Sequence, residues 1–243
     1  MFKPEQINKL NALSQYYKAD KNYAFAMAKK DKVDFIYNTS ALEGNAMTFP
    51  EVQTLLEGIT VGGHKLSDEQ QILNQNRSLT LLFEMIQNST FKINKETLCL
   101  LHAEVAKEEA LSWGVFRDAS VNIGGTEYLP PRAKELDSIF EEGVFALEKI
   151  DDLILKALTY FLFGARMQFF FDGNKRTSRL MMNAILLESG FPILNIKAKD
   201  KLEFNTQMIR FYDSGNYDEA LIYLSRYYHQ QNRHMSLQNA DPY

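Results

Sequence analysis

The chain has 243 residues, 45% of them hydrophobic, so it can bury a sizeable core as one large or two small domains. Its formal net charge of -4 provides no bulk positive field, which argues against nucleic acid or an anionic membrane surface as a partner. The single cysteine, Cys99, excludes an intrachain disulfide and favours a small buried hydrophobe in a reducing compartment.

The N-terminal residues also bear on where the protein works. They carry charged and polar side chains where a signal peptide needs an apolar core. No uncharged stretch reaches the ~18 apolar residues that span a bilayer. We therefore expect a cytoplasmic protein without a membrane segment.

Helix signals recur along most of the chain. One helix is expected to end at Gly44, and capping boxes that begin at Thr48 and Ser67 open the next two. Asn94 and either Asp151 or Asp152 are the expected caps of two later helices. The predicted helices after Gly44 cover residues 49–57, 68–88, 94–108, 151–167, 176–189, 201–213 and 217–229.

The predicted helix that ends near Met167 contains the segment LILKALTYFLFGARM, which is apolar on all faces. That pattern predicts a helix at the centre of a bundle, in contact with other helices all round. The simplest division of the chain is an N-terminal helical extension over residues 1–66, a helical core over 67–229 and a flexible tail over 230–243.

Residues 120–131, SVNIGGTEYLPP, are the exception to the helical pattern. A short β-branched run meets Gly124 and Gly125, and a second short run ends in two prolines. This pattern predicts a β-hairpin, although a surface connection is an equal alternative. The unpaired edge of an isolated hairpin can accept a strand from a partner.

The run QFFFDGNKRTSR, residues 168–179, carries the most specific chemistry. Gly173 allows a close approach of the backbone to a ligand, and the following helix N-terminus presents free N–H groups and a positive dipole. Arg176 and Arg179 share the first-turn face of that helix, where positive charge is unfavourable unless an anion is present. Asp172 is a hard oxygen ligand suited to Mg²⁺. The alternative is a solvated turn with a fortuitous pair of arginines.

This segment resembles the signature of the Fic (Fido) family, which reads HxFx, Asp or Glu, GN, Gly or Lys, and then RxxR. The matching residues are Phe170, Asp172, Gly173, Asn174, Lys175, Arg176 and Arg179. The resemblance implies that ATP or another nucleoside triphosphate binds with Mg²⁺ through Asp172, Gly173, Asn174, Lys175, Arg176 and Arg179. Asp172 would hold the metal, Gly173, Asn174 and Lys175 the α- and β-phosphates, and the two arginines the phosphate tail. Phe169, Phe170 and Phe171 are expected to pack beneath the loop, without a catalytic role.

The resemblance extends over roughly residues 35–225 and implies an all-α bundle of the Fic type with one short β-hairpin flap. The segment WGVFRDASVNIGGTEYLPP is similar to the family's Gly-x-Tyr/Phe-Arg stretch and its target-docking flap. A protein target would therefore add a strand at the flap residues Val121, Asn122, Ile123 and Gly124. The segment TSALEG, residues 39–44, resembles the family's inhibitory motif, in which Glu43 would pair with Arg179 and occupy the γ-phosphate region. A solvent-exposed Glu43 near a helix end is the alternative.

The sequence departs from the signature at Gln168, the position of the catalytic histidine in the family. In active members that histidine takes the proton from a target hydroxyl as it attacks the α-phosphorus, so AMP is transferred and pyrophosphate leaves. Glutamine cannot accept a proton near neutral pH, and a lost general base costs ~10²–10⁴ in rate. His64, His102, His229 and His234 are distant from this position in the sequence.

Three functions therefore stay open. The leading interpretation is a protein adenylyltransferase whose activity is weak, altered or lost through Gln168. The second is a non-catalytic module that binds a nucleotide or a protein. The third is a phosphotransferase similar to the Doc toxins, because these also have Lys at the position of Lys175. The target protein and the formation of a homo-oligomer are left open.

Overall fold

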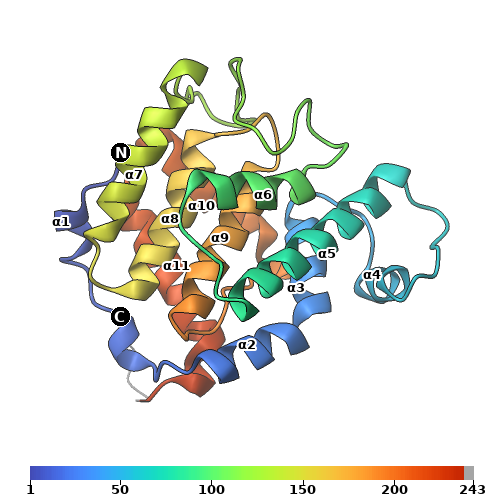
Figure 1. Ribbon diagram of the computed structural model, residues 1–243, viewed down its shortest axis with the longest axis horizontal. Helices are drawn as coiled ribbons and strands as arrows, with labels where there is room; N and C mark the ends of the chain where they lie inside the picture. The colour runs from blue at the N-terminus through green and yellow to red at the C-terminus, as the bar shows by residue number, and fades with distance from the viewer. Residues whose placement is uncertain (238–243) are drawn as a thin grey trace.

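The computed structural model describes residues 1–237, and this part of the chain is a bundle of helices (Figure 1). The all-α class predicted from the sequence is confirmed. Among residues 1–237, no helix combines the length and the apolar character needed to cross a bilayer. The α-helices are α1 (Pro4–Ile7), α2 (Lys21–Lys30), α3 (Lys32–Leu42), α4 (Phe49–Leu56), α5 (Leu66–Gln87), α6 (Lys95–Val105), α7 (Leu136–Glu148), α8 (Leu153–Met167), α9 (Asn174–Glu188), α10 (Lys201–Ser214) and α11 (Tyr217–Asn232).

Several helices begin where their caps predict. The capping box of Thr48 and Glu51 opens α4. Asn94 accepts the Thr97 N–H at the start of α6 at 2.9 Å, and Asp152 accepts the Leu155 N–H at the start of α8 at 2.8 Å. The capping box predicted at Ser67 is wrong, because α5 begins earlier, at Leu66, without a side-chain cap.

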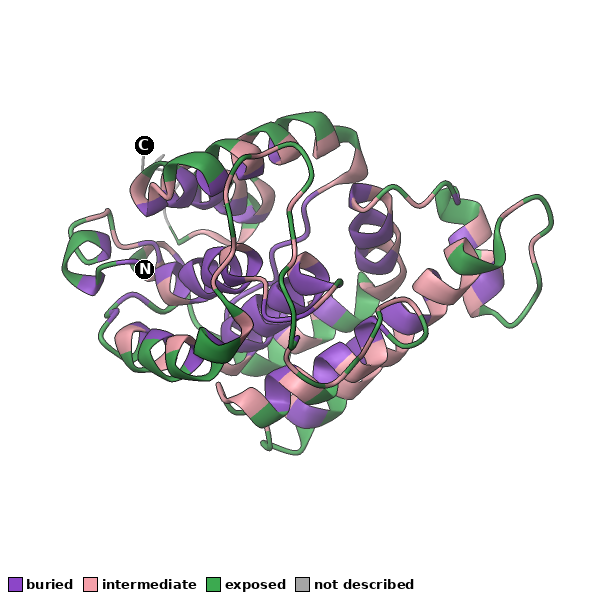
Figure 2. Cartoon of the chain, turned by 90° about the horizontal axis from the view of Figure 1, so that it is seen from above, coloured by how far each residue is buried: buried purple, intermediate pink, exposed green. Residues whose placement is uncertain are grey.

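Helix α8 lies at the centre of the bundle, as its sequence predicts. Nearly all of its side chains are buried, and it packs along α9, α7 and α11. In Figure 2 the buried surfaces of the helices face inward and the exposed surfaces face outward. Ser178 of α9 approaches Gly164 of α8, where a Cβ would lie 2.3 Å from the Ser178 hydroxyl. The α8–α9 pair therefore fixes the position of the loop that joins them.

The N-terminal region contributes to the same core. The ring of Phe2 packs edge-on against Phe163 of α8 and Tyr217 of α11, with centroids 5.8 and 5.5 Å apart. The buried hydrophobic cluster runs from Phe2 to Tyr228. Helix α4 lies at one edge of the molecule, where it contacts α3 and α5 (Figure 1).

The tail predicted from residue 230 is packed through residue 237. Helix α11 continues to Asn232, and the chain then turns back so that Tyr17 and Ser236 form an isolated antiparallel bridge. The Leu237 N–H donates to the Tyr16 carbonyl at 2.8 Å. These backbone bonds hold a polar sequence that has few apolar contacts of its own. The rest of the predicted tail, residues 238–243, lies outside the described residues.

The predicted β-hairpin over residues 120–131, which we call the flap, is not confirmed. The flap turns at Gly124 and Gly125, but neither arm forms a strand. Pro130 and Pro131 lack the N–H groups that a ladder needs. At the base of the flap, the Arg117 guanidinium takes the carbonyl of Pro131 that could otherwise accept from the other arm.

The packing of α7 on α8 predicts a strong effect of a larger side chain at Gly143. A Cβ at this position would lie 2.1–2.7 Å from atoms of the buried Phe163 ring. Gly143→Val should therefore lower the free energy of unfolding by about 2–3 kcal/mol, measured by urea denaturation. Gly62→Val is the matched control, because nothing lies within 4 Å of that position. Equal stability of the two variants would contradict the packing described here.

Candidate functional site

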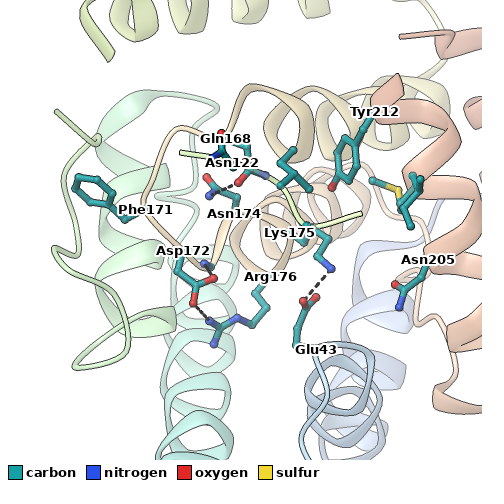
Figure 3. Close-up of a pocket in the computed structure, with 15 residues that line it drawn as sticks. Glu43, Asn122, Gln168, Phe171, Asp172, Asn174, Lys175, Arg176, Asn205 and Tyr212 are labelled. Carbon is teal, nitrogen blue, oxygen red and sulfur yellow. Dashed lines mark hydrogen bonds and ion pairs between the residues drawn. The ribbon is translucent and has the colours of Figure 1, made fainter. Parts of the chain in front are cut away.

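A cavity of about 360 Å³ opens between the start of α9, the flap and α10 (Figure 3). Its volume falls in the range of small-molecule sites, ~300–1,000 Å³. The residues that line it come from four parts of the chain: Glu43 after α3; Asn122, Ile123 and Gly124 of the flap; Gln168 and Phe171 to Arg176 of the loop and α9; and Asn205, Met208, Ile209 and Tyr212 of α10.

The loop between α8 and α9 is held in a tight turn. Gly173 has a φ of +73°, which favours glycine, and a Cβ there would lie 3.3 Å from both Ala106 and Val105. Beneath the loop, Phe169 and Phe170 are buried as predicted, whereas Phe171 lines the cavity. The loop therefore has little freedom to change shape.

The first turn of α9 begins without a side-chain cap. The Asp172 carboxylate accepts the Gly173 N–H at 2.6 Å, and the N–H groups that follow belong to the cavity-lining residues Asn174 and Lys175. Uncapped N–H groups and the positive end of the helix dipole together form an anion-binding site. The anion site expected from the sequence would lie at this first turn.

The Asn174 side chain has a structural role inside the loop. Its amide oxygen accepts the Phe170 N–H at 2.9 Å, and its NH₂ group donates to the Phe170 carbonyl at 2.8 Å and to the Gln168 amide oxygen at 3.0 Å. The amide is therefore engaged within the protein on both its oxygen and its nitrogen. The backbone N–H of Asn174 is the group left for a ligand.

Gln168 ends α8 in the left-handed conformation, with φ 52° and ψ 60°. Its NH₂ group donates to the Ala165 carbonyl at 2.6 Å, while its oxygen accepts from Asn174. Both ends of this amide are therefore hydrogen-bonded within the protein. The side chain lines the cavity as a fixed, neutral group that cannot take up a proton near neutral pH.

His102 of α6 is the histidine that contacts the loop. Its Nδ1 accepts the Gly114 N–H at 3.0 Å, so its Nε2 carries the proton and donates to the Asp172 carbonyl at 2.9 Å. The ring is fully buried and stacks on Phe170 with centroids 3.6 Å apart. Burial lowers the pKa of His102 to about 4, against the smaller opposing effect of its bond to Asp172. Both nitrogens are engaged, so His102 cannot replace the missing histidine.

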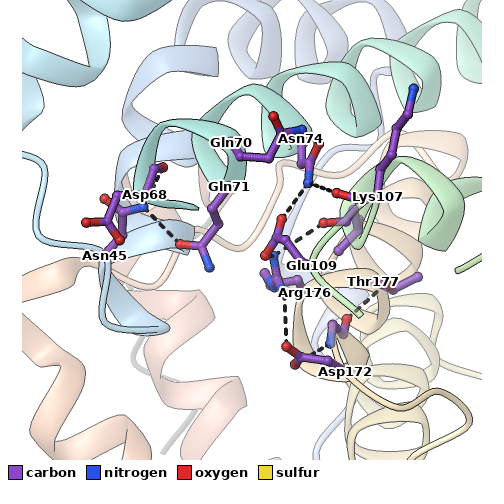
Figure 4. A network of polar contacts seen from close by, with 12 residues as sticks. Asn45, Asp68, Gln70, Gln71, Asn74, Lys107, Glu109, Asp172, Arg176 and Thr177 are labelled. Atoms are coloured by element: carbon purple, nitrogen blue, oxygen red, sulfur yellow. Dashed lines mark hydrogen bonds and ion pairs between the residues drawn. The ribbon is translucent and has the colours of Figure 1, made fainter. Parts of the chain in front are cut away.

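Arg176 and Arg179 reach different partners, although they were expected to act together on one face. Arg176 is buried, donates to Glu109 at 2.7 Å and lies 3.8 Å from the Asp172 carboxylate. Glu109 in turn accepts from Asn74 of α5, so the contacts of Arg176 extend from the loop to a distant helix (Figure 4). No local pattern in the sequence marks Glu109 as a partner.

Glu43 lies between two cations. One of its carboxylate oxygens is 2.9 Å from the Lys175 ammonium, and the other is 3.6 Å from the Arg179 guanidinium. The pairing with Arg179 agrees with the expected motif, but Lys175 is the closer partner. Burial pushes the pKa of Glu43 upward, yet Lys175 and Arg179 outweigh burial and hold this pKa below its usual value.

Arg179 is only 1% exposed, and three of its side-chain nitrogens have no hydrogen-bond partner within residues 1–237. It lies between the rings of Phe161 and Phe204, 5.9 and 5.8 Å from their centroids. Unlike Lys175 and Arg176, it does not line the cavity. Glu43 therefore covers a buried positive charge that is poorly satisfied in this state.

The charges around the cavity balance. Three cations at the start of α9 face three carboxylates, which gives a formal charge of zero at neutral pH. An anion that displaces one carboxylate would meet a net positive site. The cations are Lys175, Arg176 and Arg179, and the carboxylates are Glu43, Glu109 and Asp172.

Asp172 is the residue best placed for a metal. Its carboxylate is 66% exposed at the cavity, so it can accept a hard cation. Within residues 1–237 there is no group of three or more His, Cys, Asp or Glu side chains that could hold a metal ion. The donors fit a Mg²⁺ that takes its other oxygens from phosphates and water.

The α10 wall of the cavity was missed from the sequence. Asn205, Met208, Ile209 and Tyr212 follow helical spacing and share one face, which was the available signal. That spacing cannot tell which other element the face meets. The Tyr212 hydroxyl is buried without a hydrogen-bond partner among the described residues, and burial raises its pKa. It therefore stays protonated and can donate to a ligand.

Part of the chain matches a known protein family. Residues 92–186 match the Fic/DOC family. The protein adenylyltransferase Fic of Drosophila mojavensis is 26% identical over 202 residues, which cover 81% of this chain and 39% of that protein. The protein adenylyltransferase Fic of Aedes aegypti is 25% identical over 203 residues, with 81% and 40% covered. The chain thus spans about two fifths of the length of these relatives.

Solved structures share the fold. Fic-1 from C. elegans superposes with a TM-score of 0.76 and 18% identity, over 96% of this chain and 68% of that one. A Fic-domain signaling protein from Bacteroides thetaiotaomicron gives 0.70 and 21%, over 93% and 91%. A variant of IbpAFic2 in complex with adenylylated Cdc42 gives 0.54 and 14%, over 94% and 76%. At these identities, the similarity establishes the fold alone.

The buried His102 predicts an acid-sensitive loop. Its pKa of about 4 lies below the ordinary 6.5, so the unfolded chain binds a proton that the folded chain excludes between these values. This contribution to stability is complete above pH 6.5 and is lost as the pH falls towards 4, on the order of 3 kcal/mol in total. Urea unfolding measured from pH 7 to 4 should show this slope. His102→Phe should be less stable at pH 7 but should lose less stability on acidification, whereas parallel pH profiles would contradict the assignment.

Proposed function

We propose that this chain, in which residues 92–186 match the Fic/DOC family, binds ATP with Mg²⁺ in the cavity at the start of α9. The proposed type is a protein adenylyltransferase whose transfer step is weak, altered or lost at Gln168. The observation that carries this proposal is the uncapped first turn of α9, with Lys175 and Arg176 at the cavity. This arrangement suits a polyphosphate better than any neutral ligand.

In the proposed complex, different groups of the chain bind different parts of the nucleotide. The N–H groups of the first turn of α9 would hold the α- and β-phosphates, and Arg176 would neutralise their charge. Asp172 would hold Mg²⁺, which neutralises phosphate charge when bound. The α10 face with Met208 and Ile209 offers an apolar wall for the base.

Glu43 supports a restrained form of this site. Its carboxylate already serves as the anion for Lys175 and Arg179, so a γ-phosphate must displace it. Once Glu43 is displaced, Arg179, whose side-chain nitrogens lack hydrogen-bond partners in this state, could donate to the γ-phosphate. We propose that the chain binds ATP weakly until the turn carrying Glu43 moves.

The target would be a protein hydroxyl presented at the flap residues Val121, Asn122, Ile123 and Gly124. Its oxygen would bond to the α-phosphorus, pyrophosphate would leave, and a base would take the hydroxyl proton. Three of these flap residues line the cavity, which supports docking on this side. The missing part is the base, since the Gln168 amide is neutral and fully hydrogen-bonded.

A second candidate is a binding module without chemistry. The hydrogen bonds of Gln168 favour it, because this side chain completes the loop without offering a proton acceptor. The loop between α8 and α9, with the N–H groups and cations at the start of α9, could then bind a nucleotide or a protein partner without a transfer reaction. The two candidates differ in turnover and agree in binding.

Glu43→Gly should strengthen ATP binding more than ADP binding, because only ATP brings the phosphate that competes with Glu43. The expected gain for ATP is tenfold or more, about 1.4 kcal/mol, by titration calorimetry with Mg²⁺. Glu43→Gln is the matched control, since it removes the charge and keeps most of the volume. An equal gain for both nucleotides, or none, would sink the inhibitory role of Glu43.

Gln168→His combined with Glu43→Gly should raise AMP transfer to protein hydroxyls by about 10²–10⁴ over Glu43→Gly alone. An imidazole is largely neutral at physiological pH and can accept the proton, while residues 172–179 are unchanged. The measurement uses ATP labelled separately at the α- and γ-phosphate, with Gln168→Ala in the same background as control.

The label decides between the candidate functions. Incorporation of α-label supports AMP transfer, and γ-label supports a phosphotransferase. Strong transfer by a protein that retains Gln168 would reveal another base. ATP binding with no transfer of either label, even in the double variant, would support the binding module.

A further inference from the structure

The side chain of Arg117, just before the flap, is buried and donates hydrogen bonds to three backbone carbonyls. It is only 2% exposed, and none of the ion pairs within residues 1–237 includes it. Burial lowers its pKa, although the group stays charged. A buried charge without an anion is costly unless hydrogen bonds satisfy it. Its three partners therefore indicate what the residue does.

These partners are the backbone carbonyls at three separate points. Nη1 donates to Ala119 at 2.7 Å and Nη2 to Pro131 at 2.5 Å, at the two ends of the flap. Nε donates to the Gln168 carbonyl at 2.6 Å. Gln168 begins the loop between α8 and α9, which we call the phosphate loop. The backbone N–H of Arg117 also donates to the Phe169 carbonyl at 2.9 Å. One side chain thus joins both ends of the flap to the loop.

In the rest of the flap, the second arm makes polar and ring contacts, and Ile123 of the first arm packs against the edge of the core. The Tyr128 ring packs on the Arg166 guanidinium at 3.9 Å, and Thr126 donates to Asp213 of α10. The first arm, which contains Asn122 and Ile123, faces the cavity. Its position relative to the loop therefore depends on the base that Arg117 holds.

We propose that Arg117 is a positioning residue that sets the distance between the flap and the phosphate loop, and so the place where an acceptor hydroxyl meets the nucleotide. The inference rests on the proposed function. A planar fork with five donors can reach three carbonyls in different directions, which a lysine ammonium on a flexible stem cannot do. The residue acts on the acceptor side, so nucleotide affinity should not depend on it.

The first test measures the flap itself and needs no activity. Spin labels at Ser120→Cys in the first arm of the flap and Glu142→Cys on α7, in a Cys99→Ala background, report the distance between these exposed positions. Arg117→Met and Arg117→Lys should both broaden or shift the distance distribution. Arg132→Met is the matched control, because Arg132 is exposed at the end of the flap, and its distribution should match the parent.

The second test separates acceptor positioning from nucleotide binding. In the Gln168→His, Glu43→Gly background, Arg117→Lys should lower incorporation of α-labelled AMP into the chain on the order of tenfold to a hundredfold at saturating ATP. The Kd for ATP should change less than about twofold, within 0.4 kcal/mol. A role in overall stability alone would not produce this split.

Several results would overturn the inference. These are an unchanged distance distribution in both Arg117 variants, full activity of Arg117→Lys, or loss of the fold in both variants, which would make Arg117 a folding residue. If the parent background binds no ATP or transfers no label, the proposed function fails, and the spin-label distances still decide the role of Arg117.

Discussion

Three positive side chains in the first two turns of one helix are the constraint that the rest of this site depends on. Lys175, Arg176 and Arg179 lie at the positive end of the α9 dipole, where cations are unfavourable without anions. The fold brings carboxylates to them from three elements: Glu43 after α3 lies between Lys175 and Arg179, whereas Glu109 after α6 and Asp172 of the loop both face Arg176. The long-range contacts of Glu43 and Glu109 therefore hold the bundle together around a charge cluster as well as around an apolar core.

Under the proposed function, this arrangement separates nucleotide binding from the transfer step. The cations, the uncapped N–H groups and the tight turn at Gly173 are all present, while the position that would supply a base holds a hydrogen-bonded amide. Arg179 adds an asymmetry, because its buried nitrogens have unused donors in this state. A charge that is paired at 3.6 Å but not hydrogen-bonded leaves interaction free energy available to a better-placed anion.

The parts of the site that are local in sequence could be predicted, and the parts made by tertiary contact could not. Asp172 to Arg179 are consecutive, so a turn followed by a helix already fixes most of their geometry. Glu109, His102 and the α10 wall lie dozens of residues away, and the sequence carries no signal for which helix faces join. The turn at Gly124 was found, but strand pairing was not confirmed, because prolines and the Arg117 guanidinium occupy the base of the flap. The separation of Arg176 from Arg179 was missed, since spacing gives a shared face and not the partners on it.

The packing around Gly173 has a thermodynamic consequence. His102 and Phe170 stack beneath the loop, and a Cβ at Gly173 would lie only 3.3 Å from Val105 and Ala106. A loop that is already confined loses little conformational entropy when it closes on an anion, so the ordering cost falls on the ligand and on the turn of Glu43. The heat and entropy of association should then report the exchange of one anion for another, with almost no contribution from ordering of the loop itself.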